Sequence, residues 1–147
     1  MGGEIAVDLL QRRIVEEMSD AILFCDREGI VRLWNRGCER LFGYAAEEAV
    51  GKSLDLIIPE NLRGRHWEGY YRVMKTGETK YKTGLLSSPG VRKDGTRVSL
   101  AFSMLIVRGG DGEIAGCASI LRDVTEQWQK EKALRARIQE LEGKAAV

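Results

Sequence analysis

A single histidine in a helical stripe is the residue of this sequence with the clearest chemical potential. His66 is the only histidine among 147 residues, and it shares one face of a helix with Tyr70 and Val73 at spacings of four and three. Two interpretations are open. A neutral imidazole on a buried helix can hold a haem iron, or the ring can be a core or rim residue that bonds a backbone carbonyl.

Other reactive residue types form no recognisable site. We find no nucleophile–base triad, no phosphate-binding glycine loop and no cluster of metal ligands. Cys25, Cys38 and Cys117 are odd in number, widely spaced and without a C-x-x-C pair, so we expect reduced core thiols in a cytoplasmic protein. The sequence therefore predicts no enzymatic activity and no structural zinc.

Length and composition limit the remaining classes. The 147 residues suit one domain with a short appendage, and 44% apolar residues are enough for a core. A net charge of +1 gives no reason to expect a nucleic-acid or anionic membrane partner. No apolar run reaches the roughly 18 residues of a membrane span.

The hydrophobic pattern predicts an α+β fold with one antiparallel sheet. We expect a leader helix over residues 1–19, a central domain over 20–124 and a trailing helix over 125–147. Within the central domain the helices lie on one face of a five-stranded sheet, and the last three strands form a meander. The predicted strands cover 21–25, 30–34, 79–86, 98–106 and 114–121, with an interruption at 87–90, and the predicted helices cover 5–18, 36–42, 45–50, 53–58, 60–76 and 125–142.

A series of short motifs, in this order, resembles the PAS sensor domains over about residues 10–125. The motifs are Asp26-x-x-Gly29, Trp34-Asn35, Leu41-Phe42-Gly43-Tyr44, Ile58-Pro59, Thr76-Gly77-Glu78, Arg92-Lys93-Asp94-Gly95 and Arg122-Asp123-Val124-Thr125-Glu126. The resemblance implies a sensory or dimerising module without catalysis of its own. It also implies that flanking helices pass the signal to a downstream protein, which the sequence does not identify.

The resemblance extends to the haem-binding FixL-type and Dos-type oxygen sensors. In those domains a histidine on this helix ligates haem b, and His66 matches it, ten residues before Thr76. The resemblance then implies that Tyr70 lines the cofactor and that Gly69 makes room for the macrocycle. Gly116 and Ala118, on the last strand, are expected to leave space above the iron.

The sequence departs from those sensors on the distal side. The arginine that holds dioxygen falls at Leu86, and the methionine that serves as sixth ligand in Dos-type sensors falls at Gly84. The expected wall of Leu86, Phe102 and Met104 is apolar and offers no hydrogen-bond donor. Met104 is either a sixth ligand of the iron or a plain core residue.

Two functions follow from these observations. The first is a haem-based sensor of a diatomic gas or of redox state, with His66 as proximal ligand, working as a homodimer. The alternative is a cofactor-free or metabolite-binding dimerisation and relay module in which His66 is structural. In both, the leader helix and a short coiled-coil seam of Leu134, Ile138, Leu141 and Ala145 carry the signal.

Overall fold

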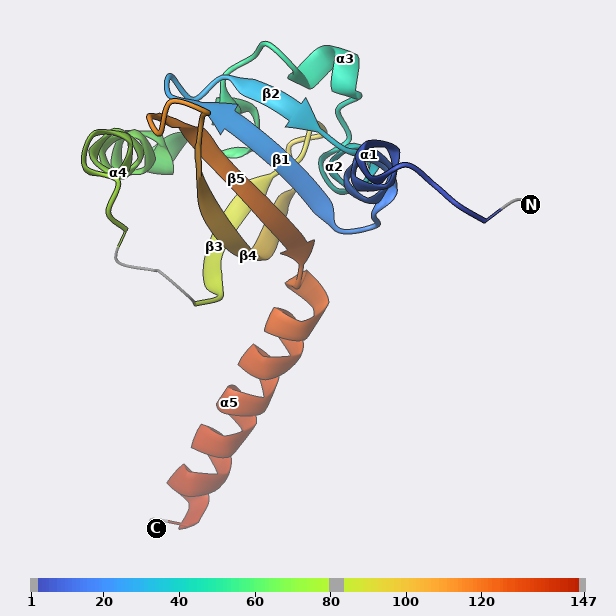
Figure 1. Ribbon diagram of the computed structural model, residues 1–147. Coiled ribbons are helices and arrows are strands. Elements are labelled where there is room, and N and C mark those ends of the chain that lie inside the picture. The colour runs from blue at the N-terminus through green and yellow to red at the C-terminus, as the bar shows by residue number, and fades with distance from the viewer. Residues whose placement is uncertain (1–2, 80–83, 146–147) are drawn as a thin grey trace.

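Five antiparallel strands form one sheet, and short helices cover one of its faces (Figure 1). The structure, a computed structural model, describes residues 3–79 and 84–145. The helices are α1 (Val7–Glu17), α2 (Arg36–Phe42), α3 (Ala46–Ala49), the 3₁₀ turns η1 (Leu54–Ile57) and η2 (Glu60–Leu62), α4 (Arg63–Thr76) and α5 (Thr125–Ala145). The strands are β1 (Ala21–Asp26), β2 (Val31–Trp34), β3 (Leu86–Val91), β4 (Arg97–Arg108) and β5 (Ile114–Asp123).

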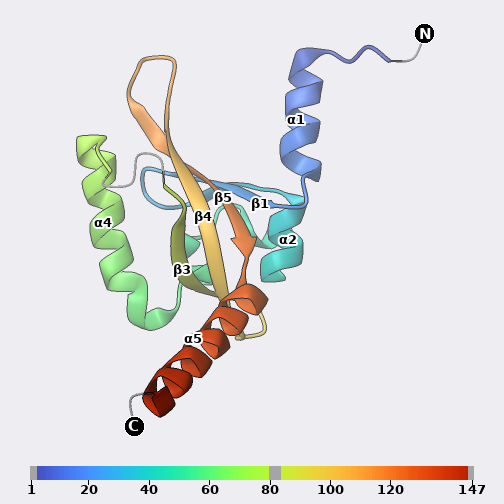
Figure 2. The same cartoon turned by 90° about the horizontal axis from the view of Figure 1, so that it is seen from below.

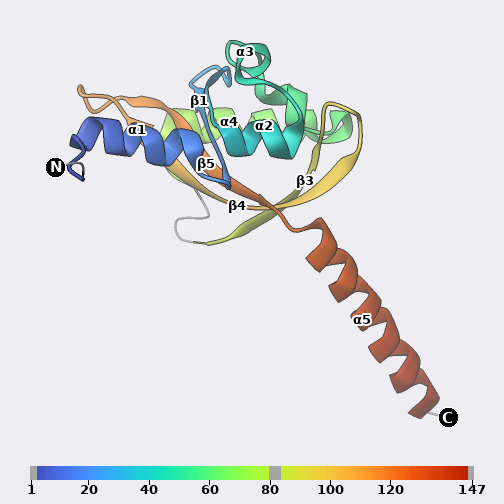
Figure 3. The same ribbon diagram turned by 90° about the vertical axis from the view of Figure 1, so that its right-hand side faces the viewer.

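The strand order is β2-β1-β5-β4-β3, so the last three strands form the expected meander and β1 lies beside β5. Helices α2, α3 and α4 lie on the same side of the sheet (Figure 3). The predicted α+β architecture is confirmed. Between this helical layer and the sheet lies an apolar core that includes Leu23, Val31, Phe42 and Leu100.

Register decides which side chains of the sheet meet the helices. Cys25 of β1 pairs with Cys117 of β5, and both are buried beneath the helical layer. Because successive side chains of a strand point to opposite faces, the neighbouring pair of Phe24 and Ala118 points the other way. We call these two sides the helix-covered face and the open face of the sheet.

The position of β3 corrects the prediction. The sequence suggested a strand over 79–86 and an interruption at 87–90, whereas β3 runs through that interruption. Proline is tolerated because β3 is an edge strand, so Pro89 needs no partner on its unpaired side. Packing is close at Gly90, since a Cβ there would lie 2.7 Å from Cδ1 of Leu100 and would displace the end of that side chain. The sequence also predicts that Lys80 and Lys82 lie on a solvated strand face, but both positions are outside the described residues.

The two flanking helices leave the domain and present apolar side chains to solvent. Helix α1 projects away from the sheet (Figure 2), and its expected stripe is exposed at Val7, Leu10 and Ile14. Helix α5 extends as a single helix from the end of β5. Within residues 3–79 and 84–145, no helix combines the length and the apolar composition that crossing a bilayer requires.

A buried asparagine joins α1, β1 and α2. The Asn35 Oδ1 accepts hydrogen bonds from the backbone N–H of Ile22 at 2.8 Å and of Cys38 at 3.0 Å, the second of which caps α2. Its Nδ2 donates to the carbonyl oxygens of Val15 at 2.8 Å and Asp20 at 3.0 Å. Asn35 is 4% exposed. If its side chain were removed, water could not easily take its place as the hydrogen-bond partner of these backbone groups.

We expect Asn35→Ala to lower the free energy of unfolding by about 3 kcal/mol, because it removes a helix cap and leaves buried donors and acceptors unpaired. Urea denaturation at neutral pH measures the change. Asn61→Ala is the matched control, since Asn61 is exposed and accepts one hydrogen bond from Arg97. Equal losses in the two variants would contradict the role assigned to Asn35.

Candidate functional site

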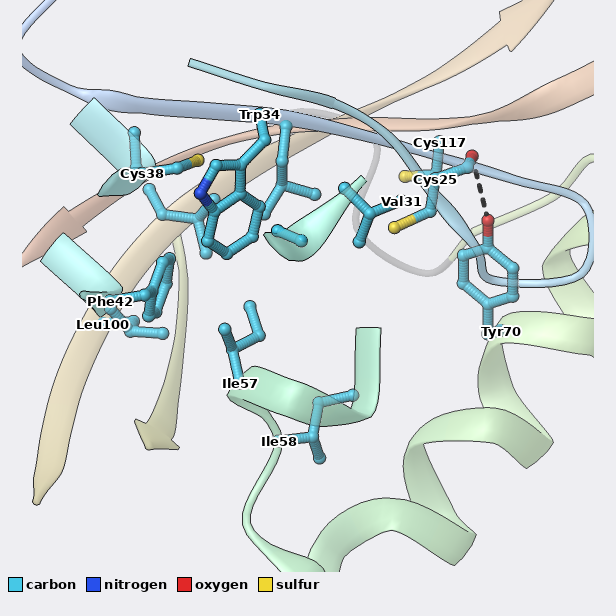
Figure 4. Packing of buried hydrophobic residues seen from close by; sticks show 14 of the residues in the cluster. Cys25, Val31, Trp34, Cys38, Phe42, Ile57, Ile58, Tyr70, Leu100 and Cys117 are labelled. Carbon is cyan, nitrogen blue, oxygen red and sulfur yellow. Dashed lines mark hydrogen bonds between the residues drawn. The ribbon is translucent and has the colours of Figure 1, made fainter. Parts of the chain in front are cut away.

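Helix α4 is held over the sheet by two side chains. The Tyr70 hydroxyl, one turn beyond His66, lies against the backbone carbonyl oxygens of Cys25, at 3.2 Å, and of Asp26 (Figure 4). Arg27 donates to the carbonyl oxygen of Ile114 at 3.0 Å and to that of Met74 at 3.5 Å. These contacts join α4 to β1 and to the beginning of β5.

The same contacts fix where Tyr70 lies along the sheet. Helix α4 and β5 run in opposite directions (Figure 2), and the Tyr70 hydroxyl lies beside the Cys25–Cys117 pair. The next pair on the helix-covered face joins Met104 of β4 to Ser119 of β5.

His66 is half-buried and lies beside two aromatic rings. Its ring centroid is 4.6 Å from that of Trp67 and 6.0 Å from that of Tyr70. Its Nδ1 is buried and has no hydrogen-bond partner in the part of the chain that the structure describes. Burial lowers the pKa of His66, and the nearby Asp55 carboxylate only partly opposes this. The imidazole is thus neutral at pH 7, the form that ligates metals.

Trp67 belongs to this environment and was missed by the sequence reasoning. Its Nε1 donates to Asp55 Oδ1 at 2.6 Å, and its ring fills the space beside Gly29 in the β1–β2 turn. Trp67 directly follows His66 and therefore lies outside the apolar stripe of the helix. Helical periodicity for this reason gave no signal for Trp67. Trp67 fixes the beginning of α4 to η1 and to the hairpin.

The expected distal residues lie on the sheet side. Leu86 is opposite Phe102 on the β3–β4 ladder, and Met104 follows two residues later on the same helix-covered face. All three are only half-buried although α4 covers this side. The helical layer therefore leaves these three apolar side chains partly exposed.

Gly69 lies beside free space. It is half-buried, and a Cβ at this position would meet no atom within 4 Å. The packing of the described residues therefore does not itself demand glycine between His66 and Tyr70. A flat group bound along this side of α4 could approach the helix backbone there.

Gly116 and Ala118 are not brought together with His66, which corrects their expected position. Both alternate with Cys117 and lie on the open face of β5. A Cβ on Gly116 would lie 2.0 Å from the Cys25 carbonyl oxygen and 2.7 Å from the Phe24 ring. Glycine is needed there for β1–β5 packing, and neither residue can line a space beneath α4.

The cysteines form no reactive or metal-binding group. All three are free and buried, and burial raises the pKa of Cys25 and of Cys38 to about 12 and raises that of Cys117. Thiols in this state are poor nucleophiles. Among the described residues, no set of three histidine, cysteine or carboxylate side chains is placed to hold a metal ion.

A groove of about 480 Å³ lies away from α4, where the β3–β4 edge meets the first turn of α5. Pro89, Leu100 and Trp128 are among the residues that line it. None of the residues that line this groove is among the neighbours of His66. The groove and the histidine are therefore two separate candidate sites.

Comparison with known proteins agrees with this geometry. Residues 15–129 match the family described as PAS fold. The chain is a PAS domain. A solved PAS domain from Colwellia psychrerythraea has the same fold, with a TM-score of 0.69 at 20% identity over 82% of this chain and 99% of that one. As a PAS domain, the chain is a sensory module of signal transduction, a kind that is generally non-catalytic.

Two curated relatives are sensors. The chain is 32% identical over 133 residues to the sensor protein FixL of Bradyrhizobium diazoefficiens, a match that covers 89% of this chain and 25% of that protein. It is 28% identical over 118 residues to the oxygen sensor protein DosP of Escherichia coli K12, covering 80% of this chain and 14% of that protein. The chain thus spans a quarter or less of each of these relatives.

The lowered pKa of His66 predicts a specific pH dependence of stability. The folded state binds the proton less readily than the unfolded state, whose histidine pKa is about 6.5, so stability is lost as pH falls through that value. The quantity to compare is the difference in free energy of unfolding between the unsubstituted protein and His66→Gln. We expect this difference to become smaller as the pH is lowered from about 8 to about 5.5. Urea denaturation at both pH values tests this, and a difference that stays constant or grows on acidification contradicts it.

Proposed function

We propose that this PAS domain binds haem b through His66 and senses a diatomic gas or the redox state of the iron. The observation that carries the proposal is a half-buried imidazole, kept neutral by partial burial, whose buried Nδ1 has no partner among the described residues. An unpaired buried nitrogen is costly unless it binds something. Metal ligation is the use for which a neutral histidine on a helix is best suited.

The surrounding residues fit a flat apolar group. His66 would supply the proximal ligand, and Gly69 and Tyr70 would flank the group on α4. Phe102 and Met104, which are both half-buried, would cover its other side. Bound haem would supply an iron centre that takes up diatomic gases and changes oxidation state.

The distal wall has a defined chemistry. Leu86 and Phe102 would line the sheet side of the bound group, and neither can donate a hydrogen bond. Met104 lies on the helix-covered face of β4, and we propose its thioether as the sixth ligand that a gas would displace. The sensor names of the FixL and DosP relatives support a sensory role of this kind for the shared domain.

We expect the full chain to take up haem stoichiometrically and to give a sharp Soret band, and we expect His66→Ala to lose the band. Absorption titration with haem measures both. Glu68→Ala is the matched control, because Glu68 lies on the same helix and is exposed. Equal, weak uptake by the wild type and the His66 variant would reject the haem site.

We also propose that two copies of the chain associate through α1 and the open face of the sheet. The supporting observation is exposed apolar surface: on α1, Ile14 is 48% exposed, and on the open face Leu105 and Ile120 are 65% and 48% exposed. Contiguous exposed apolar residues on a small protein mark an interaction surface. The segments 1–19, 20–124 and 125–147 would then act as leader, sensor and signalling helix.

This surface also supports a second candidate function, a cofactor-free dimerisation and relay module with a structural His66. In that case Tyr70, Trp67 and Arg27 would fix α4 without a cofactor, and the signal would come from a small metabolite or from a neighbouring domain. The association itself does not depend on haem. The two proposed functions therefore share one dimer interface. They differ only in whether a haem is bound beneath α4.

We expect Leu10→Glu combined with Ile14→Glu to convert a homodimer into a monomer at micromolar concentration, because charges would enter an apolar contact. Sedimentation equilibrium measures the mass. Gln11→Glu is the control, since it adds charge on the polar side of the same helix. A wild-type monomer, or a dimer that survives the double substitution, would argue against this interface.

A further inference from the structure

The groove at the β3–β4 edge has two walls, one from the sheet and one from α5. Pro89 of β3 is opposite Ser99 of β4, and Ser99 lies between two buried residues of its strand, so both side chains lie on the open face. The second wall is the indole of Trp128, in the first turn of α5. The volume of about 480 Å³ is within the range of small-molecule sites.

Hydrogen bonds hold the first turn of α5 against β4 and so fix these walls. The backbone N–H of Ser99 donates to Thr125 Oγ1 at 2.9 Å, and that of Val124 donates to the Ser99 carbonyl oxygen at 2.8 Å. The backbone N–H of Trp128 donates to the Val124 carbonyl oxygen at 2.8 Å. A site that is formed before its ligand arrives loses little freedom on binding, so this groove is preorganised for a small ligand.

The polar groups along the groove suit an anion. Among the described residues, Arg97 is the only charged side chain that lines it. Its guanidinium donates to the neutral side chain of Asn61 at 3.3 Å and forms no ion pair within residues 3–79 and 84–145. The hydroxyls of Ser87 and Ser99 also lack a hydrogen-bond partner in that part of the chain. A guanidinium is well suited to pair with a carboxylate.

The apolar surface of the groove suits a flat ring. Trp128 is 48% exposed, and an indole gains most from a partner ring that stacks on it or meets it edge to face. Pro89, on the sheet side, is also exposed. The Lys132 Nζ lies 5.1 Å from the centre of the Trp128 ring, which adds a second positive charge close to the groove.

We propose that this groove binds a small aromatic carboxylate, with its ring against Trp128 and Pro89 and its carboxylate at Arg97. The site is separate from the space beneath α4 and does not depend on haem. Because one wall belongs to the sheet and the other to α5, an occupied groove would hold the first turn of α5 against the β3–β4 edge. The ligand would therefore stabilise one direction of α5 relative to the sheet.

The test is an NMR titration of the haem-free full chain with naphthylacetate as probe. Naphthylethylamine carries the same ring with the opposite charge and is the control for the role of Arg97. The chain has three indole N–H signals, and Trp128→Phe identifies the one from Trp128. We expect naphthylacetate to shift this signal with a dissociation constant of about 1 mM or lower, and we expect the amine to bind at least about fivefold more weakly.

Two substitutions locate the site. Arg97→Gln should raise the dissociation constant about fivefold, which corresponds to the loss of one exposed ion pair. Trp128→Ala should raise it about tenfold, and Trp128→Phe should keep most of the affinity because it keeps a ring. Arg135→Gln is the matched control, since Arg135 is an exposed cation of α5 outside the groove. Backbone amide signals of Ser99 and Thr125 report binding in the variants without the indole, and thermal unfolding confirms that each variant is folded.

Three results would overturn the proposal. The first is equal affinity in the wild type, Arg97→Gln and Trp128→Ala, and the second is equal binding of the acid and the amine. The third is no binding at millimolar concentration. If the Trp128 signal then moves with protein concentration instead, the groove is an interface between two copies of the chain. None of these results depends on haem uptake, so the proposed haem function is tested separately.

Discussion

The hydrogen bonding of Tyr70 to the backbone of β1 is the interaction on which the site depends. Its hydroxyl contacts the carbonyl oxygens of Cys25 and Asp26 from the middle of α4, and together with Arg27 it fixes the position of the helix along the sheet. Breaking a buried link of this kind costs about 1–3 kcal/mol. Sliding α4 by one turn would instead place His66 over different strand residues, so the link selects the chemistry as well as the packing.

Most of the fold was predictable because local and long-range signals agree. The apolar alternation of β4 gives the longest strand, and Gly43 and Gly77, both in the left-handed region, end α2 and α4 as expected. The failure was β3. Pro89 and Gly90 are breakers in any local analysis, yet pairing with β4 along one side outweighs their propensities. A single sequence shows the local propensities of Pro89 and Gly90, but it does not show that β4 pairs with this segment.

The candidate site was predictable on the helix and ambiguous on the sheet. Helical spacing placed His66 and Tyr70 on one side of α4 because a helix with one buried face has a readable period. On β5, however, Cys117 and Leu121 alternate with Ala118 and Ile120, and both sets are apolar. Alternation separated the two faces correctly but did not tell which face meets α4, so the open-face residues Gly116 and Ala118 were chosen. The apolar open face is itself consistent with a surface that another chain covers.

The strand β5 is the element that links this site to both flanking helices. It carries Ser119 on the helix-covered face, pairs with the start of β1 at Leu121 and Ala21, and runs directly into α5. At this end Arg122 donates to Asp20 at 3.2 and 2.8 Å. Because the Arg122 side chain is 71% exposed, this ion pair contributes at most about 1 kcal/mol. The continuous β1–β5 ladder is the stronger connection, so a displacement of β5 beneath α4 has to move the base of α1 and the first turn of α5 together.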